Sequence, residues 1–411
     1  MCIFLKIFHK KYTRQTFLVQ SKIMMADQKT IKILFTLTRS ALFGDVIDHS
    51  MRDDFTAERI SDAFKTASSH DISHLVALGA EKNGLCIPKE NEIGKSVLKA
   101  VYRYEKLKYR YDAVCMALES ANVPFIPLKG SVIRRYYPQE WLRTSCDIDI
   151  LVKKEDLESA VSAFSEKLGY KCLGKSSHDV SFCSADNVRI ELHHTVIENG
   201  IANRAASVLD GLWESARLCD GSRYCYQMTD EMLYFYHIAH MAKHFLHGGC
   251  GIRPFIDLFL LDGIDGADHS ARNELLERGG LLKFAEAVSR LSMIWLGGAE
   301  ADPLSQKIEE YILFGGVYGS AENRIAVMQQ KRGGRVKYIL SKIFIPYDEI
   351  KYHYPVLEKH RFLTPFMEVR RWCKLIFCGH AKRTAREIRY NMEISADRAE
   401  KTRQFLSEVG L

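Results

Sequence analysis

The sequence contains no long hydrophobic run, and this absence excludes a membrane-spanning helix. No apolar segment approaches the roughly 18 residues that such a helix requires. The first 25 residues also lack the continuous apolar stretch and the small-residue cleavage site of a signal peptide. We therefore expect a cytoplasmic protein. We interpret residues 1–25 as an extension or disordered tail, with Met24 and Met25 as alternative starts.

Metal-binding and redox patterns of cysteine are missing as well. The 11 cysteines are scattered and form no Cys-x-x-Cys pair, so neither a zinc ribbon nor a thioredoxin-like site is indicated. The net charge of +7 is modest for 411 residues. Cations between residues 382 and 403 alternate with acids, which is typical of a solvated helix face. Contact with nucleic acid is therefore possible but not indicated.

The chain is long enough for about two or three domains, and its patterning changes twice. We predict a helical region over residues 26–122, a catalytic α+β core over 123–220 and a helical domain over 221–411. In the first region the spacing of apolar residues predicts helices at 28–44, 55–67, 72–82 and 92–121.

In the second region short apolar runs alternate with helical patterns. Strands are predicted at 125–128, 147–152, 170–173, 180–183 and 188–193, with helices at 132–137 and 154–168. In the third region helices are predicted at 229–247, 255–261, 271–290 with a break at Gly279-Gly280, and 304–314, before an irregular stretch at 348–365 and a basic helical tail at 366–409.

Two carboxylates stand one residue apart in the predicted strand 147–152. Side chains alternate along a strand, so Asp147 and Asp149 project to one face while Ile148 and Ile150 project to the other. The two acids repel each other, and a divalent cation that prefers oxygen ligands would relieve this repulsion. The alternative is a solvated strand face that carries incidental acids.

A third acid lies in the predicted strand 188–193. Alternation places Glu191 and His193 on the face opposite Ile190 and Leu192. If this strand lies beside 147–152, Glu191 joins the two aspartates around one or two magnesium ions, with manganese as an alternative metal. A surface position for Glu191 remains the other reading.

A phosphate-binding turn is predicted directly upstream of the aspartates. Gly130-Ser131 follows a strand and precedes a helix, where backbone N–H groups and the serine hydroxyl can contact phosphate. Lys129 and Arg143 are candidate phosphate ligands on either side of this turn. Each pattern is also common in ordinary turns and among surface cations.

Histidines cluster in the predicted helix 229–247. His240 and His244 are four residues apart, but Met241 occupies the position where a zinc protease has its glutamate. Three interpretations remain open: a buried stripe of aromatic and histidine side chains, a zinc pair, or a contact of Lys243 and His244 with a nucleotide.

Taken together, these segments resemble the uncharacterised nucleotidyltransferase family of the DNA polymerase β-like superfamily. The resemblance extends over about residues 30–375 and is most specific between Leu128 and His193. Its motifs are Pro127-Leu128-Lys129-Gly130, Tyr137-Pro138, Arg143, Asp147 to Val152, Ile190-Glu191-Leu192-His193 (where the family more often has Asp as the third acid), His240 to His244, Arg253 and Asp257-Leu258.

The resemblance implies a minimal nucleotidyltransferase core with a mixed sheet, flanked by helices, that depends on magnesium and takes a nucleoside triphosphate, expected to be ATP. Our first hypothesis is transfer of a nucleoside monophosphate to a small molecule, a protein hydroxyl or RNA. Asp147, Asp149 and Glu191 would hold the metal in that reaction. The alternatives are an inactive nucleotide-binding or interaction protein on the same fold, and an RNA-binding protein.

Overall fold

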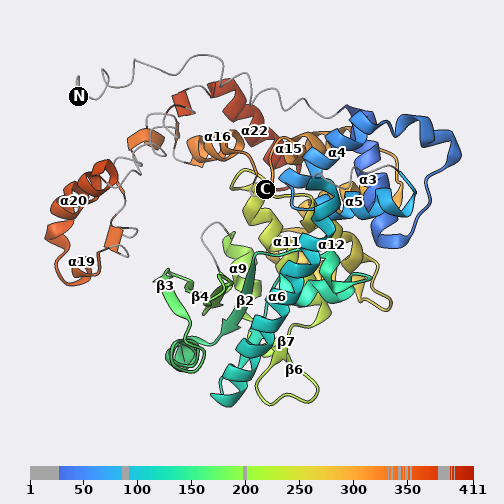
Figure 1. Ribbon diagram of the computed structural model, residues 1–411. Helices are drawn as coiled ribbons and strands as arrows, with labels where there is room; N and C mark the ends of the chain where they lie inside the picture. Colours follow the sequence, from blue (N-terminus) through green and yellow to red (C-terminus); the bar gives the residue numbers. More distant parts are fainter. Residues whose placement is uncertain are drawn as a thin grey trace.

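The computed structural model describes residues 27–85, 92–197, 201–317, 319–331, 354–377 and 394–411, with shorter pieces between 333 and 392. The predicted N-terminal tail and part of the predicted basic helix lie outside the described residues. The chain forms a mixed α+β structure that is mostly helical and contains a five-stranded sheet (Figure 1). None of the described helices combines the length and apolar character needed to cross a bilayer.

Four helices precede the sheet, as the sequence predicts. They are α3 (Gln28–Phe43), α4 (Ala57–Ser69), α5 (Ser73–Lys82) and α6 (Glu92–Ser120), with a short 3-10 turn η1 (His49–Asp54) after α3. The Asp27 and Thr56 side chains cap α3 and α4 by accepting backbone N–H groups. Helices α3 and α5 cross closely at Gly79, where an added Cβ would lie 2.0 Å from the Leu37 carbonyl oxygen.

The sheet has the strand order β1-β2-β5-β4-β3. Strands β2 and β5 run parallel, and the other neighbouring pairs run antiparallel. The strands are β1 (Phe125–Pro127), β2 (Asp147–Val152), β3 (Lys171–Lys175), β4 (Asp179–Cys183) and β5 (Arg189–His193), close to the predicted bounds.

The two faces of the sheet have different partners. Ile148, Ile150 and Ile190 belong to a cluster with α6 and with Phe164 of the segment after β2. On the opposite face Leu151 belongs to the large cluster formed by the flanking helices. That cluster contains side chains from the helices before the sheet and from the helices after it. The domain boundaries at 122/123 and 220/221 stay predictions. Asp147 and Asp149 lie on the same face as Leu151, so this acidic face is directed toward the flanking helices.

The helices after the sheet follow the predicted order. They are α11 (Asp230–Phe245), α12 (Arg253–Asp262), α13 (His269–Gly279), α14 (Leu282–Gly297) and α15 (Pro303–Leu313). The predicted break is confirmed, because Gly280 takes a left-handed conformation with φ of 70° between α13 and α14. Near the C-terminus α16 (Ala321–Lys331) packs with α22 (Ala396–Glu408), whereas α19 (Val356–Lys359) and α20 (Thr364–Phe377) lie apart in Figure 1.

Several short elements differ from the prediction. The predicted helix 132–137 is α7 (Gly130–Ile133) followed by a 3-10 turn η2 (Arg134–Tyr136). The predicted helix 154–168 divides into η4 (Lys154–Asp156), α8 (Leu157–Ser162) and a π turn η5 (Ala163–Lys167). A further 3-10 turn, η6 (Arg361–Leu363), joins α19 to α20 within the predicted irregular stretch. Elements that the pattern did not predict are η3 (Glu140–Leu142), α9 (Asn203–Asp210), α10 (Leu212–Ser215), β6 (Arg217–Leu218), β7 (Tyr226–Gln227) and α16.

Two buried histidines make the helical body sensitive to acid. Burial lowers the pKa of His70 and of His74 to about 4 in each case, although His74 Nε2 lies 2.8 Å from the Leu142 carbonyl oxygen. Above pH 6.5 the imidazoles of His70 and His74 are neutral in both the folded and the unfolded protein. As the pH falls from about 6.5 to 4, only the unfolded chain binds the protons, so stability is lost.

We predict that His74→Gln reduces this loss. The glutamine keeps an N–H donor for Leu142 but does not titrate, so about 3 kcal/mol of acid destabilisation should disappear at pH 4. Urea unfolding at pH 7 and pH 4 measures the difference. His49→Gln, a substitution of an exposed histidine in η1, is the control. An equal pH dependence in wild type and His74→Gln would contradict the prediction.

Candidate active site

Asp149 and Glu191 lie directly opposite each other on the parallel strands β2 and β5. Parallel partners point to the same face, so the predicted convergence of these two acids occurs. His193 of β5 adds an imidazole to this face. The ligand atoms of Asp149, Glu191 and His193 all lie within 4.8 Å of one another. We call these three side chains the acid cluster.

Asp147 lies on the same face, two residues before Asp149 and opposite Arg189. Burial raises the pKa of Asp147, and the nearby charge of Asp149 raises it further. Burial likewise raises the pKa of Glu191, again with a contribution from Asp149. These shifts have the sign expected for crowded carboxylates and favour an added positive charge at this face.

Asp149 remains ionised because two basic groups meet one of its oxygens. Lys129 Nζ lies 2.8 Å and His193 Nε2 lies 2.9 Å from Asp149 Oδ1. Burial would raise the pKa of Asp149, but Lys129 and His193 outweigh it and hold the pKa well below its usual range. His193 Nε2 is also 3.7 Å from Glu191 Oε2, so the imidazole joins the two carboxylates.

Lys129 reaches the acid cluster from a tight bend between β1 and α7. The Leu128 N–H donates to the Asp149 carbonyl oxygen at 3.0 Å, which fixes the bend beside β2. Lys129 itself has φ of 45° and ψ of −117°, a region that favours glycine. Strained backbone at such a position is typical of functional sites. The predicted bend therefore lies next to the predicted acids.

Gly130 and Ser131 follow in the bend. A Cβ at Gly130 would lie 2.6 Å from Arg143 Nη1 and 3.0 Å from Ser145 Oγ, so the position requires glycine for packing. The Ser131 N–H donates to the Leu128 carbonyl oxygen at 3.2 Å as part of the turn. The bend is compact, and a phosphate contact by these residues remains a prediction.

Arg143 lies in a buried ion pair. Its Nε and Nη2 donate to the two carboxylate oxygens of Asp257 in α12 at 2.8 and 2.7 Å. The Tyr137 hydroxyl donates to the same carboxylate at 2.7 Å. Arg253 at the start of α12 donates to the Thr144 carbonyl oxygen at 2.8 Å. These contacts fix the loop before β2 against the helical body and leave Arg143 largely engaged.

The histidines of α11 lie near the acid cluster. His240 Nε2 and His244 Nε2 are 3.2 Å apart, and the Lys243 carbonyl oxygen contacts His247 Nδ1 at 2.7 Å. Burial lowers the pKa of His240 well below its usual range, and Lys129 is among the nearby cations that lower it further. His240 of α11 therefore lies within electrostatic range of Lys129. The contact of Lys243 and His244 with a nucleotide stays a prediction.

The donor set fits a divalent cation. Carboxylate oxygens are the ligands that Mg²⁺ and Mn²⁺ prefer, and an imidazole nitrogen suits Mn²⁺ better than Mg²⁺. Over the residues that the structure describes, the acid cluster is the one group of three such side chains close enough to share an ion. Strand alternation predicts the face on which His193 lies, but His193 is not among the predicted site residues.

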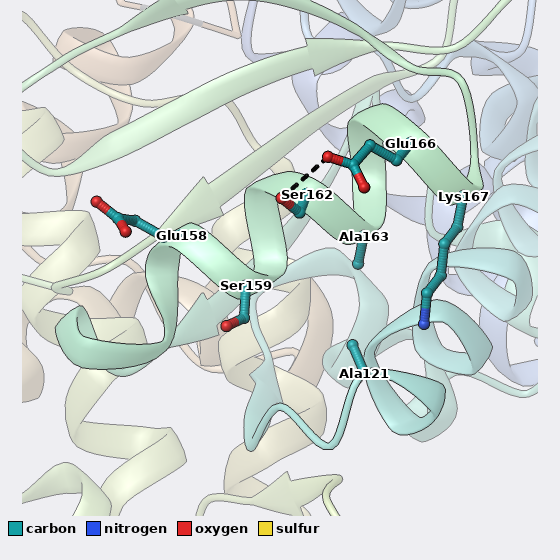
Figure 2. Close-up of a pocket in the computed structure, with 7 residues that line it drawn as sticks. All are labelled: Ala121, Glu158, Ser159, Ser162, Ala163, Glu166 and Lys167. Atoms are coloured by element: carbon teal, nitrogen blue, oxygen red, sulfur yellow. Dashed lines mark hydrogen bonds between the residues drawn. The ribbon is translucent and has the colours of Figure 1, made fainter.

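A surface hollow lies away from the acids. It has a volume of about 390 Å³ and lies between α8, η5 and the end of α6, which cover the apolar face of the sheet. Figure 2 shows short and charged side chains around it, without a converging group of acids. Its lining residues are Ala121, Glu158, Ser159, Ser162, Ala163, Glu166 and Lys167.

A mixed sheet that presents paired carboxylates beside a strand-to-helix bend is the arrangement expected of nucleotidyl-transferring proteins. The chain belongs to the uncharacterised nucleotidyltransferase family, whose model matches residues 56–297. The matched stretch includes all five strands of the sheet, the acid cluster and α11. This confirms the family resemblance. No curated protein matches the chain.

We predict that Lys129→Met increases the affinity of the free protein for Mn²⁺. The ammonium group neutralises Asp149, so its removal leaves the carboxylates to attract a cation without competition. About a tenfold tighter binding is expected in calorimetric titration with the metal alone. Lys154→Met, at an exposed lysine beyond the other end of β2, is the control. Unchanged or weaker Mn²⁺ binding would contradict a metal site at Asp149.

Proposed function

We propose that the protein is a metal-dependent nucleotidyltransferase that moves a nucleoside monophosphate from a nucleoside triphosphate to a hydroxyl acceptor and releases pyrophosphate. The observation that carries this proposal is the pairing of Asp149 with Glu191 on parallel strands, beside the bend at Lys129. Family membership supports it. Strands β1 to β5 then form the minimal polymerase β-like core.

In this proposal three carboxylates hold Mg²⁺, or Mn²⁺ in its place. Carboxylate oxygens of Asp149 and Glu191 lie close enough to share one ion, and Asp147 lies on the same face at the start of β2. A bound cation supplies charge neutralisation on the triphosphate and at the departing pyrophosphate. Because burial and Asp149 raise the pKa of Glu191, its carboxylate is suited to accept the proton of the acceptor hydroxyl.

The donor triphosphate, expected to be ATP, is assigned to the bend and to α11. Lys129 is a phosphate ligand that exchanges Asp149 for the triphosphate, and Gly130 and Ser131 bring the backbone close to it. Lys243 and His244 contact the nucleotide from α11. We assign Arg143 a positioning role, because its pairing with Asp257 fixes the loop that leads to Asp147.

One observation favours a second candidate function. Lys129 already forms a 2.8 Å ion pair with Asp149, which neutralises a carboxylate that a metal would need. In a protein that binds nucleotide without turnover, Lys129 would take the place of the metal and neutralise Asp149. The two candidates differ in one measurable property, the dependence of pyrophosphate release on the acids.

We predict that Asp147→Asn combined with Asp149→Asn lowers pyrophosphate release by about a thousandfold or more. Metal binding contributes several kcal/mol to the transition state, and each 1.36 kcal/mol corresponds to a factor of ten. The assay uses each of the four nucleoside triphosphates with Mg²⁺ and a pool of small-molecule acceptors. Asp112→Asn, at an exposed acid on α6, should retain full activity.

Activity that survives the double substitution would reject the assigned site. Tight triphosphate binding by the wild type without any pyrophosphate release would instead favour the nucleotide-binding protein. Titration of the triphosphates by calorimetry separates these outcomes, because it measures binding in the wild type and in the double variant.

A further inference from the structure

A second cavity lies on the side of the molecule formed by the first helices. It has a volume of about 340 Å³, which is within the range of small-molecule sites. Its walls come from α4, the turn before α5, α5, α6 and the loop that precedes β2. The lining residues are Phe64, Ser68, Asp71, Ser73, His74, Ser96, Lys99, Ala100, Arg103 and Thr144. We call it the α4–α6 cavity.

The α4–α6 cavity adjoins the proposed metal-binding acids through Thr144. Thr144 lies three residues before Asp147, and three residues of extended chain span at most about 11 Å. Cys146 lies between them, and its thiol is exposed. The chain therefore leads from the cavity wall at Thr144 past Cys146 to the first of the acids, Asp147.

The cavity has a surplus of positive charge next to its polar wall. Arg103 Nη1 lies 2.9 Å from both carboxylate oxygens of Asp71. Arg253 Nη1 also lies 3.4 Å from Asp71, so one carboxylate contacts two guanidinium groups. Within the part of the chain that the structure describes, Arg103 Nε and Nη2 have no hydrogen-bond acceptor. Those donors match the oxygens of a phosphate or carboxylate.

The remaining lining suits a compact, hydroxylated molecule. Ser73 supplies a hydroxyl group, whereas the buried Phe64 and Ala100 form an apolar part of the wall. His74 is buried and is held by the Leu142 carbonyl oxygen. Such a mixture of few placed polar groups and apolar surface is typical of small-ligand sites. A cavity of this volume does not admit a folded protein segment or an RNA strand.

We propose that the α4–α6 cavity is the acceptor subsite, and that it takes a small polyhydroxyl compound that carries a phosphate or a carboxylate. Arg103 binds the anionic group, and a hydroxyl of the same molecule reaches past Cys146 toward Asp147. This inference rests on the proposed nucleotidyltransferase function and names the substrate class for it.

The step that this placement serves balances as a substitution at phosphorus. The acceptor hydroxyl oxygen forms a bond to the α-phosphorus of the triphosphate. The bond from that phosphorus to the oxygen bridging the β-phosphate breaks, and pyrophosphate leaves with the electron pair. The hydroxyl proton passes to a carboxylate of the site and then to solvent. No oxidant or reductant is required.

The test measures binding of defined probes to the full-length protein without nucleotide. Glycerol 3-phosphate and gluconate represent the phosphate and carboxylate classes, inorganic phosphate tests the anion alone, and glucose is the neutral comparison. Calorimetry gives the affinities. The alkylation rate of Cys146, followed by mass spectrometry of its peptide with and without probe, reports whether the bound probe extends from the cavity past Cys146.

We predict that glycerol 3-phosphate or gluconate binds more tightly than glucose and slows alkylation of Cys146. Arg103→Gln should weaken this binding about tenfold or more, because a hydrogen bond to a charged group is lost. Arg103→Lys, which keeps the charge, should restore part of it. Arg110→Gln is the matched control, since this arginine of α6 also pairs with an aspartate, Asp186, but does not line the cavity.

Glucose binding as tightly as both anions, no binding of any probe, or anion binding unchanged by Arg103→Gln would each overturn the proposal. The proposal would also be overturned if inorganic phosphate bound but glycerol 3-phosphate and gluconate did not. Failure of the proposed function is distinguishable, because the combined substitution of Asp147 and Asp149 by Asn should abolish pyrophosphate release and leave anion binding and protection of Cys146 within about twofold.

Discussion

The ion pair between Lys129 and Asp149 is the interaction on which the arrangement of this site depends. Parallel pairing of β2 and β5 places Asp149 opposite Glu191, and burial of such carboxylates is unfavourable unless a positive group compensates for it. Lys129 and His193 provide that compensation at a single oxygen. The strained backbone of Lys129 is the cost of bringing its ammonium group to this position.

The second constraint is the buried pairing of Arg143 with Asp257. It joins the loop before β2 to α12, and Tyr137 and Arg253 add hydrogen bonds on either side. A buried pair with so many partners is strongly destabilising to break, by about 3–5 kcal/mol when one member is removed. The sheet and the helical body are thereby held in one arrangement. Gly130 is required by the same contact, since Arg143 occupies the space of its missing side chain.

Local patterning predicted the parts of this structure that depend on sequence periodicity. Alternation in 147–152 and 188–193 placed Asp149, Glu191 and His193 on one face, and the break at Gly280 followed from glycine at a helix end. The partner of Arg143 depends on a contact between residues 114 positions apart, which no local pattern encodes. The division of 154–168 into three short helical elements and the hairpin of β6 and β7 also depend on packing, because elements of two to six residues contain too few side chains for a period.

Two parts of the chain with different chemistry influence the acid face. On one side α11 brings His240 and its neighbours into the electrostatic range of Lys129. On the other side the loop from Thr144 to Asp147 connects the acids to Arg103, Asp71 and the helices before the sheet. A transfer between two substrates needs both to approach the same acids from different directions. The helices before and after the sheet share one hydrophobic cluster, so these two parts are fixed relative to each other by the same packing that covers the acid face.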